Sequence, residues 1–267
     1  MTATLIPAAD RHFWENEWLT SRQSFPGTGN FDIFANAHGV LAMHNDDVIG
    51  PGEGLDNHAH QNMEILTWVV EGAVWHKDSH GNTETIGTGS LGAMTAGKGI
   101  THTERNAAAR ASRESVRVVQ MWVPPHTDEL EPAHSTRDFN VALASGEPVV
   151  VASGRPEHAD SDALHIENRF ATLHIARPRT GQTITLPGAP FGHLFTVRGS
   201  VSVSGNNSVS GNNRGSGGST AGDDLVAQPL AEGDAIRFTD SGPLTVTATD
   251  DAEIVYWEMY ASFDRAH

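Results

Sequence analysis

The chain has 267 residues, 38% of them hydrophobic, and a formal net charge of −16 at pH 7. This size fits one large or two medium globular domains, and the acidic balance argues against direct binding to nucleic acids or anionic membranes, which depends on Lys and Arg. Cysteine is absent, which excludes disulfides and thiolate metal sites, and no apolar run approaches the roughly 18 residues of a transmembrane helix. Residues 1–7 lack the pattern of a secretory signal, so we expect a cytoplasmic protein.

A histidine pair follows the first glycine-rich turn. Gly52 and Gly54 precede His58 and His60, in a stretch with the character of a β-strand. Side chains at i and i+2 of a strand point to the same face, so the two imidazoles share one direction. Glycine permits positive-φ turns and close backbone approach at the mouth of a small barrel. A lone His-x-His pair is more often solvated or hydrogen-bonded than metal-bound.

Strand signals continue through the first half. Apolar and β-branched segments predict strands at residues 64–70, 73–76 and 115–123, with a turn at residues 78–82. Long periodic helices are missing. Many short strands separated by Gly and Pro turns indicate barrels or sandwiches.

A second ligand pair lies between these strands. Gly97 and Gly99 precede His102 and Glu104, which again have i, i+2 spacing. If the two paired strands lie side by side, three imidazoles and one carboxylate converge, a set that suits Fe, Mn, Ni, Cu or Zn. The chain has 15 histidines, so chance spacings compete with this interpretation, but two glycine-rich turns that each deliver a ligand pair favour it. The predicted metal ligands are His58, His60, His102 and Glu104.

The second half repeats the pattern in degraded form. Strands are predicted at residues 149–151, 171–175, 183–186, 194–197, 201–204 and 254–259. No His-x-His follows residue 140, and His193 stands alone, which is typical of a structural histidine. We therefore expect one metal site, in the first half.

We expect two domains, at residues 1–132 and 133–267, because residues 126–140 form a polar stretch with Pro and His. Residues 204–223 are rich in Gly, Ser and Asn, and they predict a flexible hairpin insertion in the second domain. Such an insertion costs little, because loop-closure entropy grows only logarithmically with length.

The ligand motifs resemble those of a known family. Gly52-x5-His58-x-His60-x3-Glu64 is similar to the first cupin motif, and Gly99-x2-His102-x3-Asn106 to the second. Residues 10–125 more narrowly resemble the pirin family, and in particular its bacterial branch with quercetin 2,3-dioxygenase activity. Proline is usual at Ala59 and serine is common at Thr103, but neither position supplies a ligand. The resemblance implies an all-β bicupin, with two jelly-roll cupin barrels and one competent metal site.

The resemblance also implies a reaction. One divalent transition metal per chain, iron first and Mn, Ni, Co, Cu or Zn as alternatives, would promote cleavage of a flavonol such as quercetin by O₂ with release of CO. Three imidazoles and one carboxylate leave a coordination position open, as catalytic sites require. Glu104 is the expected proton acceptor as well as a ligand. Glu64 shares strand parity with His58 and His60, and we expect it to orient a histidine or to form a salt bridge at the rim.

Two other functions stay open. Eukaryotic proteins resembling this chain act as iron-dependent transcriptional cofactors, so the chain could be a redox-sensing interaction module with a protein partner. It could also be another small-molecule cupin enzyme, since fold alone does not decide function.

Overall fold

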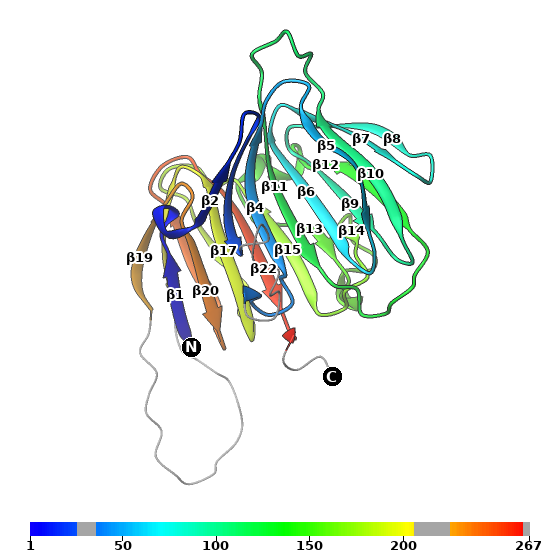
Figure 1. The fold of residues 1–267 in the computed structure, drawn as a ribbon. Helices are drawn as coiled ribbons and strands as arrows, with labels where there is room; N and C mark the ends of the chain where they lie inside the picture. Colours follow the sequence, from blue (N-terminus) through cyan, green and yellow to red (C-terminus); the bar gives the residue numbers. More distant parts are fainter. Residues whose placement is uncertain (26–35, 206–224, 264–267) are drawn as a thin grey trace.

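The computed structural model describes residues 1–25, 36–205 and 225–263, and nearly all of its regular structure is β-strand (Figure 1). The expectation of an all-β bicupin is confirmed. Short 3-10 helices lie at η1 (Ala8–Asp10), η2 (Ala142–Ser145) and η3 (Pro156–His158). Within the described residues, no helix is long and apolar enough to cross a membrane.

The first half forms two antiparallel sheets that enclose one barrel interior. The larger sheet has the order β12 (Ala133–Asp138), β9 (Ser90–Thr95), β6 (Glu64–Glu71), β11 (Val116–Val123), β4 (Met43–Ile49), β3 (Leu19–Phe25), β2 (His12–Glu15). The smaller sheet has the order β5 (Gly54–His60), β10 (Ile100–Asn106), β7 (Ala73–Asp78), β8 (Thr83–Gly87). Val69 and Val118 of the larger sheet pack with Val74 and Ile86 of the smaller one.

The second half also has a larger and a smaller sheet. Its larger sheet has the order β1 (Thr2–Ile6), β20 (Ala235–Thr239), β17 (Phe191–Arg198), β22 (Glu253–Met259), β15 (Ala171–Ala176), β13 (Val149–Ser153), β14 (Leu164–His165). Its smaller sheet has the order β16 (Thr183–Leu186), β21 (Leu244–Ala248), β18 (Ser200–Gly205), β19 (Leu225–Ala231). Phe238 and Tyr256 of the larger sheet share an apolar core with Val203 and Val246 of the smaller one.

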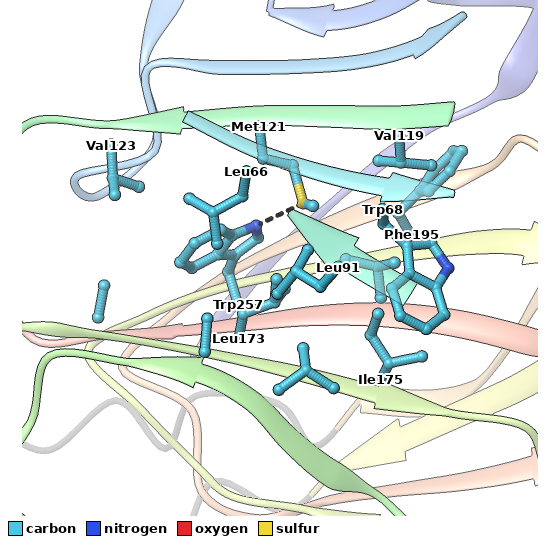
Figure 2. Close-up of a cluster of buried hydrophobic side chains, with 14 of the residues drawn as sticks. Leu66, Trp68, Leu91, Val119, Met121, Val123, Leu173, Ile175, Phe195 and Trp257 are labelled. Atoms are coloured by element: carbon cyan, nitrogen blue, oxygen red, sulfur yellow. Dashed lines mark hydrogen bonds between the residues drawn. The ribbon is translucent and has the colours of Figure 1, made fainter. Parts of the chain in front are cut away.

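The two larger sheets pack against each other and form the main hydrophobic core (Figure 2). Leu66 and Met121 come from the first half, and Leu173 and Trp257 from the second. The indole N–H of Trp257 points to the Met121 sulfur at 3.2 Å. Each large apolar side chain that is fully buried here contributes about 1.5–3 kcal/mol. The halves are therefore joined by a core and not by a polar contact surface.

Alternation along β6 decides which residues reach which compartment. Leu66, Trp68 and Val70 belong to the core between the halves. Val69 packs inside the first barrel, and Thr67 borders a cavity there. Successive side chains of a strand point to opposite faces, so one strand serves both the interface and the barrel interior.

The end strands of the two halves are exchanged across the expected domain boundary. β1 pairs with β20 of the second half, as Figure 1 shows, and β12 pairs with β9 of the first half. The division at residues 132 and 133 stays a prediction, but strand pairing crosses it at both ends of the first domain.

Most predicted strands agree with the structure to within one to three residues at each end. The strand predicted at residues 183–186 is β16 with the same bounds, and that predicted at 194–197 is extended to Phe191–Arg198. The insertion predicted at residues 204–223 lies outside the described residues beyond Gly205.

We predict that Leu66→Ala destabilises the whole protein by about 2–5 kcal/mol, because it leaves a cavity in the core shared by both halves. Urea unfolding followed by fluorescence and by circular dichroism should show one transition, shifted to lower urea. Val141→Ala is the control, since Val141 is 92% exposed and its loss should change stability by less than about 0.5 kcal/mol. Two separate transitions, with only one of them shifted, would contradict a shared core.

Candidate metal centre

The two predicted ligand pairs lie on neighbouring strands. β5 and β10 pair antiparallel, with His102 opposite His58 and Ile100 opposite His60. The ring centroids of His58 and His102 are 4.3 Å apart, and those of His58 and His60 are 4.9 Å apart. The third pair, His60 and His102, is separated by 5.0 Å. The structure therefore brings the three predicted histidines together.

Two glycines make this convergence sterically possible. Gly54, at the start of β5, has a φ of +154°, and a Cβ there would collide with the backbone of Glu104 and Arg105. Gly97 has a φ of +47° in the turn before β10, and a Cβ there would collide with the Leu130 carbonyl. Only glycine combines these conformations with so close an approach.

Glu104 lies apart from the first cluster. The ligand atoms of His58, His60 and His102 all lie within 4.8 Å of one another, and we call these residues the outer triad. A register shift follows His102 on β10, and Glu104 lies opposite His76 of β7. His76, His102 and Glu104 form a second such group, the inner triad, also within 4.8 Å. The four predicted ligands are thus divided between two triads that share His102.

His76 is a candidate ligand that the sequence analysis missed. It has a signal of the same kind, because His76-x-Asp78 places two polar side chains on one face of a strand. The spacing of residues along the chain does not show that β7 pairs with β10 on the side opposite β5. That knowledge requires the sheet order β5-β10-β7-β8.

Burial keeps the imidazoles of His60 and His102 neutral. Desolvation, reinforced by the neighbouring histidines, lowers the pKa of His60 to about 4 and that of His102 to about 3. Neutral imidazole carries the lone pair that binds a metal. A ring nitrogen of His58, Nδ1, lies 2.7 Å from the Asp56 carbonyl oxygen. When Nδ1 donates its proton there, Nε2 is left as the ligand atom.

The donor set fits a transition metal. His102 is 1% exposed, and both of its ring nitrogens are buried without a hydrogen-bond partner. Leaving a buried polar atom unsatisfied costs about 1–3 kcal/mol, and a metal bound to one nitrogen would remove part of that cost. Imidazole and carboxylate ligands suit Fe, Mn, Ni, Cu or Zn.

Glu104 is held from the facing sheet. The amide of Gln120, on β11, donates to its carboxylate at 2.9 Å, and the Thr67 hydroxyl, on β6, donates at 3.3 Å. The side chain is 8% exposed. A carboxylate fixed by two donors has a defined direction, which a base or a ligand requires.

A cavity of about 30 Å³ lies beside Glu104 and is bordered by Thr67, Asp47 and Gln120. This is room for about one water molecule. Desolvation raises the pKa of Asp47 to about 7. The cavity is therefore a small chamber in which these polar groups meet apolar side chains such as Val74 and Val118.

Glu64 was expected to orient one of the clustered histidines, but the structure places it on a different strand from His58 and His60. A turn with Asn62 at a φ of 49° ends β5, so Glu64 begins β6 and strand parity with His58 is lost. Like Leu66, it faces the other half. Its carboxylate accepts a hydrogen bond from the Thr95 hydroxyl, on β9 of the first half, at 2.8 Å, and one from the backbone N–H of Glu167, in the second half, at 3.1 Å. Burial raises its pKa to about 7.

His193, expected to be structural, lies in the interface between the halves. It is fully buried, and its ring packs 4.7 Å from that of His44. Desolvation, followed by the nearby His44, lowers the pKa of His193 well below its ordinary value. Both triads lie in the first half, and one metal per chain stays a prediction.

Several known proteins are similar to this chain in sequence and in fold. The family described as Pirin matches residues 8–123. A protein of Mycobacterium tuberculosis named "putative quercetin 2,3-dioxygenase" is 39% identical over 263 residues, which cover 98% of this chain and 97% of that protein. A quercetin 2,3-dioxygenase of Escherichia coli is 37% identical over 136 residues, 51% of this chain and 58% of that protein.

The crystal structure of the bacterial pirin YhhW from Escherichia coli, in complex with nickel(II), has a TM-score of 0.79. It is 25% identical and covers 97% of this chain and 100% of its own. Fold and site together define a bicupin with a histidine-rich first barrel. The chain belongs to the pirin family.

We predict that His58→Ala, His60→Ala and His102→Ala each lower the metal content of the purified protein, because each removes one imidazole from the outer triad. His102→Ala should have the largest effect, since His102 belongs to both triads. Mass spectrometry of the metal measures this, and His165→Ala, whose side chain is 66% exposed, is the control. Full occupancy in both His60→Ala and His102→Ala would refute the assignment.

Glu64→Gln should stabilise the protein increasingly as the pH rises from 5 to 8. The pKa of Glu64 is raised in the folded state to about 7, so its stabilising contribution is complete below the unfolded value and is lost as the pH rises through 7. The difference approaches on the order of 3 kcal/mol. Urea unfolding at each pH measures it, with Glu131→Gln as a control whose side chain is 79% exposed. A pH-independent difference would contradict the raised pKa.

Proposed function

We propose that the protein is a metal-dependent dioxygenase that cleaves flavonols such as quercetin. The observation that carries this proposal is Glu104, a buried carboxylate held by Gln120 and Thr67 beside a cluster of histidines. Similarity to proteins named quercetin 2,3-dioxygenase supports the choice of substrate.

The residues that would hold the ion are His58, His60, His102 and Glu104. One divalent transition metal per chain is proposed, with iron first; the related YhhW was crystallised with nickel(II). When bound, such a metal lowers the pKa of a substrate hydroxyl and orients the resulting anion.

The remaining work belongs to the side chains of this chain. Glu104 accepts the proton of the flavonol 3-hydroxyl, and the Gln120 and Thr67 donors keep its carboxylate in place before and after the transfer. Burial lowers the pKa of His60 and of His102, so these rings stay unprotonated and available as ligands.

Exposure indicates from which side the substrate arrives. His58 and His60 are partly exposed, whereas His102 and Glu104 are buried. The 30 Å³ cavity beside Glu104 is too small for a flavonol. We infer that the ring system lies outside it, on the His58 and His60 side, where the Trp122 ring meets His60 edge-on at 5.0 Å.

The reaction balances with O₂ as the only co-substrate. Both oxygen atoms enter the product, at C2 and C4 of the flavonol. The C2–C3 and C3–C4 bonds break, and C3 leaves with its own oxygen as CO. The proton held on Glu104 returns to the product carboxylate, which leaves the enzyme as it began.

We predict that Glu104→Gln retains part of the metal but loses quercetin turnover by about 10²–10⁴-fold, the usual contribution of a general base. Gln keeps the size and one ligand oxygen but removes the basic carboxylate. Oxygen uptake and CO release measure turnover, and anaerobic titration with quercetin measures binding separately. Glu131→Gln, at an exposed position, is the matched control.

If the wild-type protein loaded with Fe, Mn, Ni, Co or Cu consumes no oxygen with any flavonol, the dioxygenase proposal fails. A partner whose binding depends on the redox state of the metal would then identify an interaction module.

A further inference from the structure

We propose that the inner triad of His76, His102 and Glu104 is a second binding site for the divalent ion. A single ion can then occupy either triad, because both contain His102. This goes beyond the proposed function, because it concerns where the ion binds and holds with or without flavonol turnover.

The order of the strands in the smaller sheet creates the second binding site. β10 lies between β5 and β7, so its inward side chains have neighbours on both sides. On the β7 side, His76 lies opposite Glu104, and Asp78 lies opposite His102. His76 and His102 are each 1% exposed. The inner triad is therefore buried throughout, unlike the outer one.

His76 is braced as metal-binding histidines are. Its Nε2 lies 3.4 Å from the Asp78 carboxylate. Asp78 in turn accepts hydrogen bonds from the backbone of His80 and Asn82 and from the Asn82 amide, at 2.9, 3.0 and 2.7 Å. A carboxylate fixed in this way sets the tautomer of a ligand histidine and raises its basicity.

A second contact fixes the plane of the same ring. His134, on β12, stacks on His76 with centroids 4.1 Å apart and planes inclined by 10°. His134 itself lies outside both triads. The ring of His76 is thus held on one face by stacking and at one nitrogen by Asp78.

Space and reach are sufficient for one ion. A cavity of about 10 Å³ is bordered by His76, His102, Glu104 and His134, about the size of one small sphere. Two nitrogens bound at about 2.1 Å lie at most about 4.2 Å apart. Ligand atoms within 4.8 Å of one another therefore need only small side-chain rotations to close on an ion.

One ion is expected and not two. The triads share His102, and Glu104 is the one carboxylate in either of them. Two adjacent dications would repel strongly with so little negative charge to bridge them. An ion bound at one triad thus excludes a second ion at the other.

The test uses apo-protein titrated with Co²⁺ against a competing chelator, and circular dichroism confirms that each variant is folded. The wild type should bind one Co²⁺. The double variant His58→Ala, His60→Ala should still bind one ion, with weaker affinity, through the inner triad. Adding His76→Ala to this double variant should weaken binding further by about 10-fold or more.

Adding His165→Ala instead, at a side chain that is 66% exposed and outside both triads, should leave the affinity of the double variant unchanged. Equal Co²⁺ affinities of the double variant with and without His76→Ala would refute the proposal that the inner triad binds the ion. Binding of two Co²⁺ ions by the wild type would refute it as well. No flavonol is involved, so a protein inert toward flavonols still gives a decisive result here.

Discussion

The position of β10 between β5 and β7 is the constraint on which the rest of the site depends. A central strand presents each inward side chain to two neighbours. His102 meets His58 on one side and Asp78 on the other. The register shift after His102 breaks the match with β5 but leaves that with β7 intact, so Glu104 lies opposite His76. One irregularity in a ladder therefore decides which ligands a carboxylate can join.

The two barrels use the same architecture for different ends. The second barrel is filled by a continuous apolar core. The first has two small apolar clusters, one with Val69 and one with Ile65, and between them lie buried polar groups and small cavities. A barrel that buries histidines and carboxylates gives up hydrophobic stabilisation. The core between the halves offsets that loss, because it supplies apolar contacts outside the barrel.

The sequence predicted the features that depend on local pattern. Strand positions could be inferred from apolar and β-branched segments, and the two ligand pairs from i, i+2 spacing after glycine-rich turns. The pairing of the His58 and His102 strands was a condition of that prediction, and the structure meets it. What could not be inferred depends on sheet order and turn geometry. His76 requires knowing the second neighbour of β10, and the true direction of Glu64 requires knowing that the chain turns at Asn62 and begins a new strand. Parity holds only within one strand.

The second half takes part in the site although both triads lie in the first. Thr67 and Gln120, which hold Glu104, alternate along β6 and β11 with residues buried in the core between the halves, among them Leu66 and Met121 (Figure 2). Trp68, next to Thr67, donates its indole N–H to Glu253 of the second half at 2.8 Å. A close-packed core resists displacement of the strands that line it. The second barrel thus acts as a rigid support for the strands that position Glu104.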